Sequence, residues 1–373
     1  MQIMDSYKPA GKGMNVFEGP GPIGMKELLE TENIDWEKIK EVLQKGPQQF
    51  EELLFKIHYK RKKELPVDRR SRILNFLSTA YLITNDIRYF NEFLWFYDDG
   101  NSDKKLMDGC MERFNSNLDA DGCHPLSEQL KQFRINTEGR ELNKLKDNKP
   151  TPLRICLVGF PPFFGKIIKE LKDRGHHVEQ FFLPYHPDRK INRLLKFRPA
   201  VKLIALLSGN KYSYKTLDYD YKDERIGEAL RAGKFDIGFH KLNFIIKENI
   251  FNAFRIGLLN DHWGYLPLLR GKSTIAYSLL LKVPVISSIH FINKGIDSGP
   301  IAGYQYCDYE AAASVKEVRN IIRKTMPERI ISAIQYAGST EFTAKENIQE
   351  AGVTFYEIHP WLNDHINTRI LKQ

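Results

Sequence analysis

The sequence predicts an α/β protein whose mostly parallel sheet is preceded by an all-α N-terminal domain. The chain has 373 residues, enough for about two domains at roughly 150 residues each. Hydrophobic residues make up 42% and charged residues 28%, which is typical of globular proteins and excludes a disordered or collagen-like chain. Helical spacing of apolar residues fills the first part, whereas strand-like and helix-like runs alternate in the second.

The N-terminal part divides into three segments by composition. Residues 1–24 are rich in glycine, proline and lysine and are expected to form an irregular arm. From residue 25 to 145 apolar residues recur at helical spacing, as in the stripe of Ile73, Leu74, Leu77 and Tyr81, which predicts a domain of about four to six short helices. The polar, proline-ending stretch 146–152 is expected to be a linker.

The part from residue 153 to 310 predicts a sheet covered by helices on both faces. Strands are expected at 154–160, 178–183, 201–207, 235–240, 256–260, 285–292 and 301–307. Helices are expected at 164–174, 224–232, 247–253 and 273–281. Continuously apolar strands that alternate with helices are typical of a parallel sheet. Residues 311–373 are expected to form a C-terminal helix, at 315–336, and a tail.

Composition also limits the partners of the chain. Lysine and arginine total 56 against 47 acidic residues, so the net charge of +9 favours anionic partners such as nucleic acid, phosphates or carboxylates. No apolar run is long enough to span a membrane, and the N-terminus does not resemble a secretory signal. The four cysteines contain no C-x-x-C pair, and Cys110, Cys123 and His124 lack paired ligand spacing. We therefore expect a cytoplasmic protein without a metal or a membrane partner.

Candidate catalytic residues follow two of the expected strands. Ligands of open α/β sheets bind beyond the carboxyl ends of the strands. Asn260 and His262 follow one strand and Asp297 follows another, so the three side chains converge if those strands are neighbours. An amide can stabilise an oxyanion, an imidazole can move protons near neutral pH, and a carboxylate can orient the imidazole. This set suits acyl transfer to an amine that attacks directly.

The same residues resemble the motif of the folate-dependent formyltransferase family. Asn260 and His262 fill an N-x-H pattern, followed in register by Leu266-Pro267 and Arg270-Gly271. Asp297, 35 residues after His262, begins a D-x-G pattern. That family includes glycinamide ribonucleotide, methionyl-tRNA and sugar-nucleotide formyltransferases and formyltetrahydrofolate hydrolases. The similarity covers about residues 153–310.

The resemblance implies a Rossmann-like formyltransferase domain that uses N10-formyltetrahydrofolate and no metal. It implies that Asn260, His262 and Asp297 are the catalytic trio. It also implies that two short segments bind the pterin of the cofactor. These are Phe244, Ile245 and Ile246 on one side, and a loop with Ile292, Asn293 and Lys294 on the other.

The chain departs from the family pattern near these residues. Gly264 stands where the family often has serine, and Ile286-Ser287-Ser288 replaces the usual G-V-T before a loop one residue shorter. We expect these departures to reshape the acceptor side without removing a catalytic group. Arg270 is expected to anchor a loop. His290, Ser288 and Asp261 either support the trio or face solvent.

The function expected from the resemblance is transfer of a formyl group to a primary amine. The acceptor is expected to be a nucleotide-linked amino sugar or another small metabolite. Transfer to tRNA is disfavoured, because no segment the size of the tRNA enzymes' C-terminal domain follows residue 340. A formyltetrahydrofolate hydrolase and a non-catalytic folate-binding scaffold are the alternatives. A homo-oligomer formed through the helical domain remains open.

Overall fold

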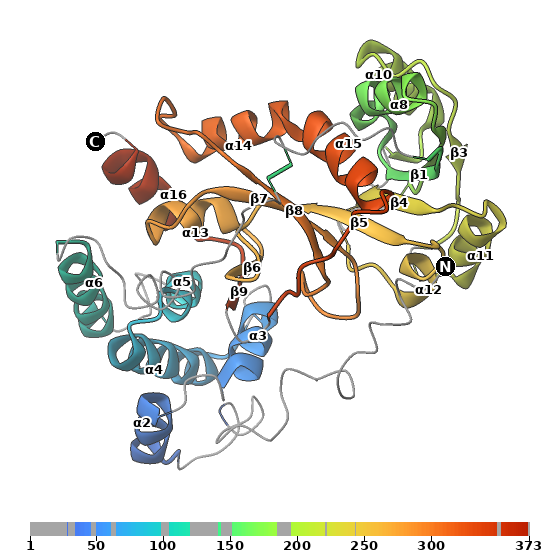
Figure 1. Ribbon diagram of the computed structural model, residues 1–373. Helices are drawn as coiled ribbons and strands as arrows, with labels where there is room; N and C mark the ends of the chain where they lie inside the picture. The colour runs from blue at the N-terminus through green and yellow to red at the C-terminus, as the bar shows by residue number, and fades with distance from the viewer. Residues whose placement is uncertain are drawn as a thin grey trace.

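A seven-stranded sheet forms the centre of the molecule, in the order β3-β2-β1-β4-β5-β7-β8 (Figure 1). The computed structural model describes residues 28, 34–45, 50–60, 65–97, 104–119, 141–142, 151–184, 195–220, 222–242, 244–348 and 352–371. The strands are β1 (Arg154–Gly159), β2 (His177–Phe182), β3 (Lys215–Thr216), β4 (Ile237–Lys241), β5 (Gly257–His262), β7 (Ile286–Phe291) and β8 (Ile301–Tyr306). The first five pair in parallel and the last two are antiparallel, which confirms the predicted mostly parallel sheet.

Helices cover both faces of the parallel strands. One face packs against α8 (Gly165–Asp173) and α15 (Met326–Ala337), and the other against α11 (Glu224–Ala232) and α12 (Glu248–Phe251). Because alternate residues of a strand point to opposite faces, Leu157 lies in the first core and Val158 in the second. Strands buried on both faces need apolar residues throughout, which is why their sequences do not alternate.

One predicted strand, residues 201–207, is wrong. This segment belongs to helix α10 (Arg198–Leu207), with Pro199 in its first turn, a position that proline tolerates well. Val201 and Ala205, four residues apart, are its buried residues, whereas Leu203 and Leu207 are 56% and 77% exposed. The edge of the sheet is instead formed by the two-residue strand β3.

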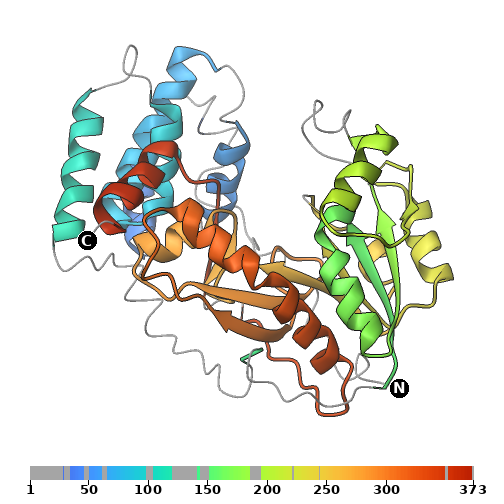
Figure 2. The ribbon, with the colours of Figure 1, turned by 90° about the horizontal axis from the view of Figure 1, so that it is seen from above.

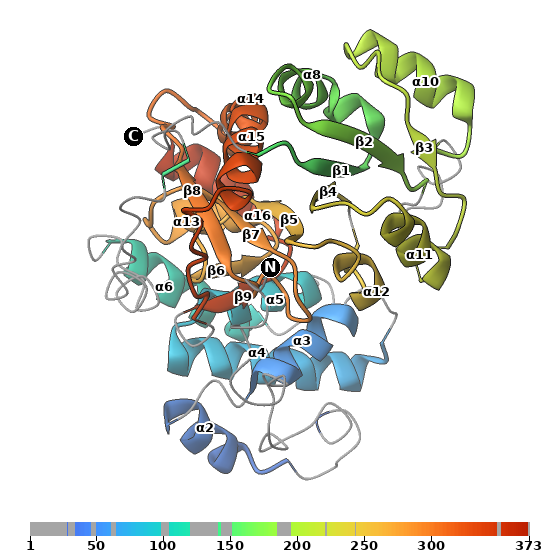
Figure 3. The ribbon, with the colours of Figure 1, turned by 45° about the vertical axis from the view of Figure 1, so that its right-hand side comes forward.

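Most of the described part of residues 25–145 is helical, as predicted, but Glu141 instead forms a parallel β-bridge with Tyr304 of β8. Its helices are α2 (Trp36–Lys45), α3 (Glu51–Lys60), α4 (Val67–Thr84), α5 (Ile87–Phe96) and α6 (Lys104–Asp119). They lie at the end of the molecule away from α10 and β3 (Figures 2 and 3). Asp86 begins α5 as its N-cap and accepts a hydrogen bond from the Arg88 amide.

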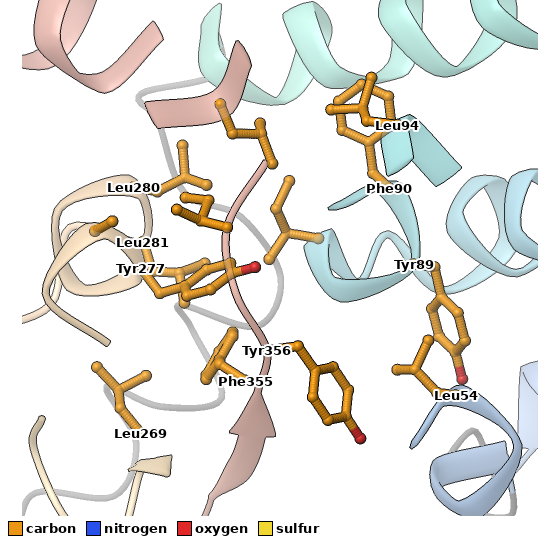
Figure 4. Packing of buried hydrophobic residues seen from close by; sticks show 14 of the residues in the cluster. Leu54, Tyr89, Phe90, Leu94, Leu269, Tyr277, Leu280, Leu281, Phe355 and Tyr356 are labelled. Carbon is orange, nitrogen blue, oxygen red and sulfur yellow. The ribbon is translucent and has the colours of Figure 1, made fainter. Parts of the chain in front are cut away.

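These helices share one hydrophobic core with the second half of the chain. Leu54, Tyr89 and Phe90 pack in the same cluster as Tyr277 and Phe355 (Figure 4). The contact also includes hydrogen bonds. The Asn91 side chain donates to the Glu357 carbonyl oxygen at 3.2 Å and accepts from the His359 amide at 2.7 Å. The helical region is therefore fixed to the C-terminal segment by apolar packing and by hydrogen bonds between the Asn91 side chain and the backbone.

The C-terminal part contains more elements than the sequence predicted. The expected helix at 315–336 is divided at Thr325 into α14 (Val315–Lys324) and α15, which carries Pro327 in its first turn. The predicted helix at 273–281 is α13 (Thr274–Leu280). Two short strands, β6 (Leu269–Gly271) and β9 (Val353–Phe355), form a separate parallel pair. The chain then ends in α16 (Pro360–His365) and the π-helical turn η4 (Ile366–Ile370).

Candidate active site

His262, the last residue of β5, lies between two oxygen acceptors. Its Nε2 is 2.7 Å from the carbonyl oxygen of Leu269, and its Nδ1 is 3.4 Å from Oδ2 of Asp297. A carbonyl oxygen and a carboxylate oxygen can only accept. Each ring nitrogen therefore faces an acceptor, and the ring donates to both neighbours when both nitrogens carry protons. The ring is 6% exposed.

Asp297 is held between two imidazole rings and a backbone amide. Its Oδ2 accepts from the Gly271 amide at 2.8 Å, and its Oδ1 lies 3.5 Å from Nε2 of His290. Burial raises the pKa of Asp297. The charge of His262 and the hydrogen bonds from His290 and the Gly271 amide more than offset this effect, so the pKa lies well below its usual range. Asp297 is therefore a carboxylate at neutral pH.

The three predicted catalytic side chains come together, but not in the way expected for parallel strands. Strand β7 is antiparallel to β5, and Leu259 pairs with Phe291, so β7 ends beside the middle of β5. The segment after β7 then returns to the end of β5 and brings Asp297 to His262. Asn347 holds this segment, because its side-chain amide donates to the Asp297 carbonyl oxygen at 2.8 Å.

Asn260 is the third member of this group. Its side-chain Nδ2 lies 3.2 Å from Nε2 of His290, which is its register partner on β7. The other ring nitrogen of His290, Nδ1, lies 2.8 Å from the carbonyl oxygen of Phe291 and so carries the proton. Nε2 faces both the Asn260 amide and Oδ1 of Asp297, and it accepts from the amide when unprotonated or donates to the carboxylate when protonated. The Asn260 amide has two N–H bonds, so one is left for a ligand. His290 contacts both Asn260 and Asp297, and Asp297 in turn contacts His262. The three predicted side chains therefore belong to one connected group.

The residues between His262 and Asp297 position the site. The Ser288 hydroxyl donates to the Gly264 carbonyl oxygen at 2.7 Å and accepts from the Leu266 amide at 3.1 Å. Gly271, whose amide binds Asp297, has φ of 87°, a conformation that favours glycine. Arg270 is buried and donates to the Gly352 carbonyl oxygen at 2.9 Å, as a loop anchor does.

Gly264 leaves the space that the His262 ring occupies. A Cβ atom built at residue 264 would meet Nε2 of His262, and it would lie 2.8 Å from the carbonyl oxygen of Leu269. These are the two atoms of the hydrogen bond that anchors the ring. The departure from serine at this position therefore has a physical consequence, because it leaves room for this orientation of His262.

Ser288, His290 and Asp261 are all buried, so a solvent-facing role for them is wrong. Asp261 points to the opposite face of β5 and forms a two-point ion pair with Arg329 of α15, at 2.8 and 2.7 Å. Burial raises the pKa of Asp261, but the charge of Arg329 outweighs it and the pKa is well below its usual range. This pair fixes α15 to the strand that carries Asn260 and His262.

The predicted pterin segments lie at one apolar cluster on the Asn260 face of the sheet. Ile246 is buried in this cluster, and Phe244 and Ile292 pack against it. Ile245, by contrast, is 69% exposed. In the second segment, Oδ1 of Asn293 accepts from the Ser298 hydroxyl at 2.6 Å, and Lys294 pairs with Glu248 of α12 at 3.1 Å.

His240 was missed as a site residue by the sequence analysis. It lies near the end of β4, where it is the register partner of Asn260, and it is 4% exposed. Burial lowers the pKa of His240 to about 3, and the charges of His290 and Lys241 contribute in the same direction. The signal was present in the sequence, because His240 ends an expected strand just as Asn260 does.

Neither a metal cluster nor a membrane-spanning helix occurs in the part of the chain that the structure describes. No three His, Cys, Asp or Glu side chains there are grouped so that they could hold a metal ion. No helix among these residues combines the length and the apolar character needed to cross a bilayer. Cys110, Cys156 and Cys307 are free thiols. Cys123 and His124, considered above as metal ligands, lie outside the described residues.

Comparison with known proteins gives sequence relatives and structural neighbours. No family model matches the chain. A methionyl-tRNA formyltransferase of Bifidobacterium animalis subsp. lactis is 24% identical over 218 residues, which are 54% of this chain and 67% of that protein. A methionyl-tRNA formyltransferase of Nitrosospira multiformis is 28% identical over 151 residues, 40% of this chain and 47% of that protein. The chain thus spans about half to two thirds of the curated relatives that it matches.

Solved structures of formyltransferases also match. A 4-N formyltransferase from Francisella tularensis has a TM-score of 0.42 and 18% identity, covering 58% of this chain and 87% of that one. A sugar N-formyltransferase from a Shewanella species has a TM-score of 0.42 and 17% identity, covering 58% and 86%. The sequence matches are to proteins named methionyl-tRNA formyltransferase, a class that the motif at Asn260, His262 and Asp297 also resembles. By sequence, the chain is therefore similar to methionyl-tRNA formyltransferases over about half of its length.

Proposed function

We propose that this chain transfers a formyl group from N10-formyltetrahydrofolate to a primary amine. The observation that carries the proposal is the arrangement around His262, an imidazole held between the Leu269 carbonyl oxygen and the Asp297 carboxylate. It places an amide donor, an imidazole and a carboxylate at one end of the sheet. These groups suit direct attack by an amine, which forms no covalent intermediate with the enzyme.

Each residue has a separate role in the proposed reaction. The Asn260 amide donates to the formyl oxygen, which becomes negative when the amine attacks the formyl carbon. His262, anchored through Nε2, presents its Nδ1 proton toward the site for transfer to the leaving nitrogen of the folate. Asp297 orients His262 and collects the proton of the amine through water. Asp297 then passes this proton to His262, which replaces the one given to the folate nitrogen.

The pterin of the folate is proposed to bind against the apolar cluster near β4 and β5. Support comes from Ile246, Leu258 and Phe254, which make one cluster on the same face as Asn260, with Ile292 packed against it. An apolar surface beside a few polar groups is typical of small-molecule sites. We propose that the backbone of Phe244, Ile245 and Ile246 and the segment with Ile292, Asn293 and Lys294 complete this pocket.

The acceptor proposed is an amino sugar linked to a nucleotide. The surplus of 56 basic over 47 acidic residues favours an acceptor that carries phosphate. Methionyl-tRNA carries phosphates as well, and the sequence relatives described above are named for that acceptor. An experiment that identifies the acceptor must therefore test nucleotide-linked amino sugars and methionyl-tRNA side by side.

The test follows release of tetrahydrofolate from N10-formyltetrahydrofolate, first without an amine and then with nucleotide-linked amino sugars, small amines or methionyl-tRNA. We expect release only with an amine, and almost none from His262→Ala. His177→Ala is the matched control, because His177 is exposed at the start of β2, far from the trio in sequence and topology. Release without any amine would instead identify a hydrolase that passes the formyl group to water.

A non-catalytic folate-binding scaffold is the remaining alternative. Isothermal titration with N10-formyltetrahydrofolate would detect binding by the wild-type chain. Binding without release in any acceptor condition would favour the scaffold. Normal turnover by the His262→Ala protein would contradict the assigned chemistry, since that variant lacks the group proposed to move the proton.

A further inference from the structure

His240 stands in a row of polar side chains that crosses three strands at the candidate active site. It pairs in register with Asn260 of β5, and Asn260 pairs with His290 of β7. Register partners project from the same face of a sheet, and neighbouring strands lie about 4.8 Å apart. His240 therefore shares a face with Asn260, the proposed oxyanion donor. It also interacts electrostatically with His290 and Asp297.

One nitrogen of the His240 ring is buried without a partner. Nδ1 accepts from the Leu242 amide at 3.4 Å, which assigns the ring proton to Nε2. Nε2 is buried and has no hydrogen-bond partner in the part of the chain that the structure describes. A buried donor without a partner destabilises the fold, so a buried N–H at the end of a strand is favourable where a ligand supplies the acceptor.

The surroundings determine which ligand atom fits this donor. Burial is the main reason why the pKa of His240 is lowered to about 3; His290 and Lys241 lower it further, and the charge of Asp297 acts in the opposite direction. His240 is therefore uncharged at neutral pH and can donate a hydrogen bond without itself titrating there. A fixed neutral N–H donor in a buried position suits an oxygen atom that gains negative charge.

We propose that His240 donates a hydrogen bond through Nε2 to the formyl oxygen, as a second oxyanion donor beside Asn260. This inference rests on the proposed function. When the amine nitrogen bonds to the formyl carbon, the carbonyl electron pair moves to the oxygen that Asn260 and His240 hold. When that pair returns, the bond from carbon to N10 breaks and N10 takes the proton of His262. The proton of the amine passes to Asp297 and then to His262, so the cycle balances.

Two variants separate donation from a structural role. His240→Phe keeps an aromatic ring but removes the N–H group. His240→Gln keeps an amide donor near the position of Nε2. Loss of one oxyanion donor lowers kcat by about 10²–10³-fold in known cases. We expect kcat of His240→Phe to fall by about 10- to 1,000-fold, with KM for N10-formyltetrahydrofolate changed less than about threefold, and most of kcat to return in His240→Gln.

The pH profile provides a further readout. Because His240 does not titrate near neutral pH, we expect the same profile shape in wild type and His240→Gln. Full kcat in His240→Phe, or a rise in KM with unchanged kcat, would overturn the inference while leaving the proposed function intact. An inactive wild-type chain, tested with every acceptor, would overturn both.

A binding measurement keeps the inference testable if His240→Phe fails to fold. The wild-type chain, labelled with ¹⁵N in its histidines, is titrated with 10-formyl-5,8-dideazafolate, a stable analogue that carries the formyl group. We expect a downfield shift of the Nε2 proton of His240, assigned by its loss in His240→Gln. Binding of the analogue without any shift of that signal would contradict donation to the formyl oxygen.

Discussion

Replacing Gly264 with alanine tests whether His262 must be anchored through Nε2. The added Cβ would meet Nε2 of His262 and would lie 2.8 Å from the carbonyl oxygen of Leu269. The ring and the carbonyl oxygen, now 2.7 Å apart, could not both keep their places. The ring would turn, and Nδ1 would lose its position beside Asp297.

The size of the effect follows from the hydrogen bond that is lost. A hydrogen bond that involves a charged group contributes about 1.5–3 kcal/mol. If that energy holds His262 in the reactive orientation, losing it removes the same amount from transition-state stabilisation. Since about 1.4 kcal/mol corresponds to a factor of ten in rate, we expect kcat of Gly264→Ala to fall by about 10- to 150-fold.

The assay is amine-dependent release of tetrahydrofolate, with thermal unfolding measured on the same samples. Gly109→Ala is the matched control, because a Cβ at Gly109 in α6 meets nothing within 4 Å. We expect that control to keep full activity and to unfold at a slightly higher temperature, since alanine favours a helix over glycine. A Gly264→Ala protein with the stability and the kcat of wild type would refute the anchoring role of Leu269.

Two other substitutions test the carboxylates of the site. Asp297→Asn should keep the backbone, because asparagine also tolerates the observed φ of 47°, but kcat should fall by about 100-fold or more, measured in the same assay with a folding check by circular dichroism. Arg329→Met leaves Asp261 buried without its two-point partner and should reduce the free energy of unfolding in urea by about 3–5 kcal/mol. The pKa of Asp261 is lower in the folded chain than in the unfolded chain, so the ion pair stabilises the fold at neutral pH and its contribution decreases as the pH falls below about 4. The stability difference between wild type and Arg329→Met should therefore shrink on acidification, and a constant difference would contradict this assignment.

The sequence predicted most of the sheet because its strands are buried on both faces. Strand β1 contains the unbroken apolar run Ile155–Val158, β5 begins with Leu258 and Leu259, and the helices between the strands show clear 3.6-residue periodicity. The same rule failed at α10, where an apolar run of strand length forms a helix with all three of its leucines exposed. Periodicity cannot separate a short apolar helix from a buried strand. Strands β6 and β9 were missed because each has only three residues and pairs with a distant segment.

The candidate site was predicted in part. Asn260, His262 and Asp297 were identified by their spacing, and the structure brings them together. Their supporting contacts depend on tertiary structure. The hydrogen bond that the Gly271 amide donates to Asp297 forms only because the segment after β7 returns to β5. The place of His240 depends on strand order, which brings β4 beside β5 although their register is not visible in the sequence.

The role of the helical region could not be inferred from its composition. Its apolar stripes predicted helices correctly, but not the surface that they cover. In the structure they pack against β6, β9 and α13, and His58 of α3 stacks on Tyr356 with ring centroids 4.5 Å apart. Such contacts between segments about 300 residues apart leave no periodic signal in either segment.

Transfer of the formyl carbon itself tests the central claim most directly. N10-formyltetrahydrofolate carrying ¹³C in its formyl group would be incubated with the wild-type chain and the acceptor panel, and the labelled products identified by mass spectrometry and NMR. Labelled carbon on an N-formylated amine, absent in His262→Ala, is the result that the proposed mechanism predicts. Label recovered only as formate, or remaining entirely on the folate with every acceptor, would contradict it.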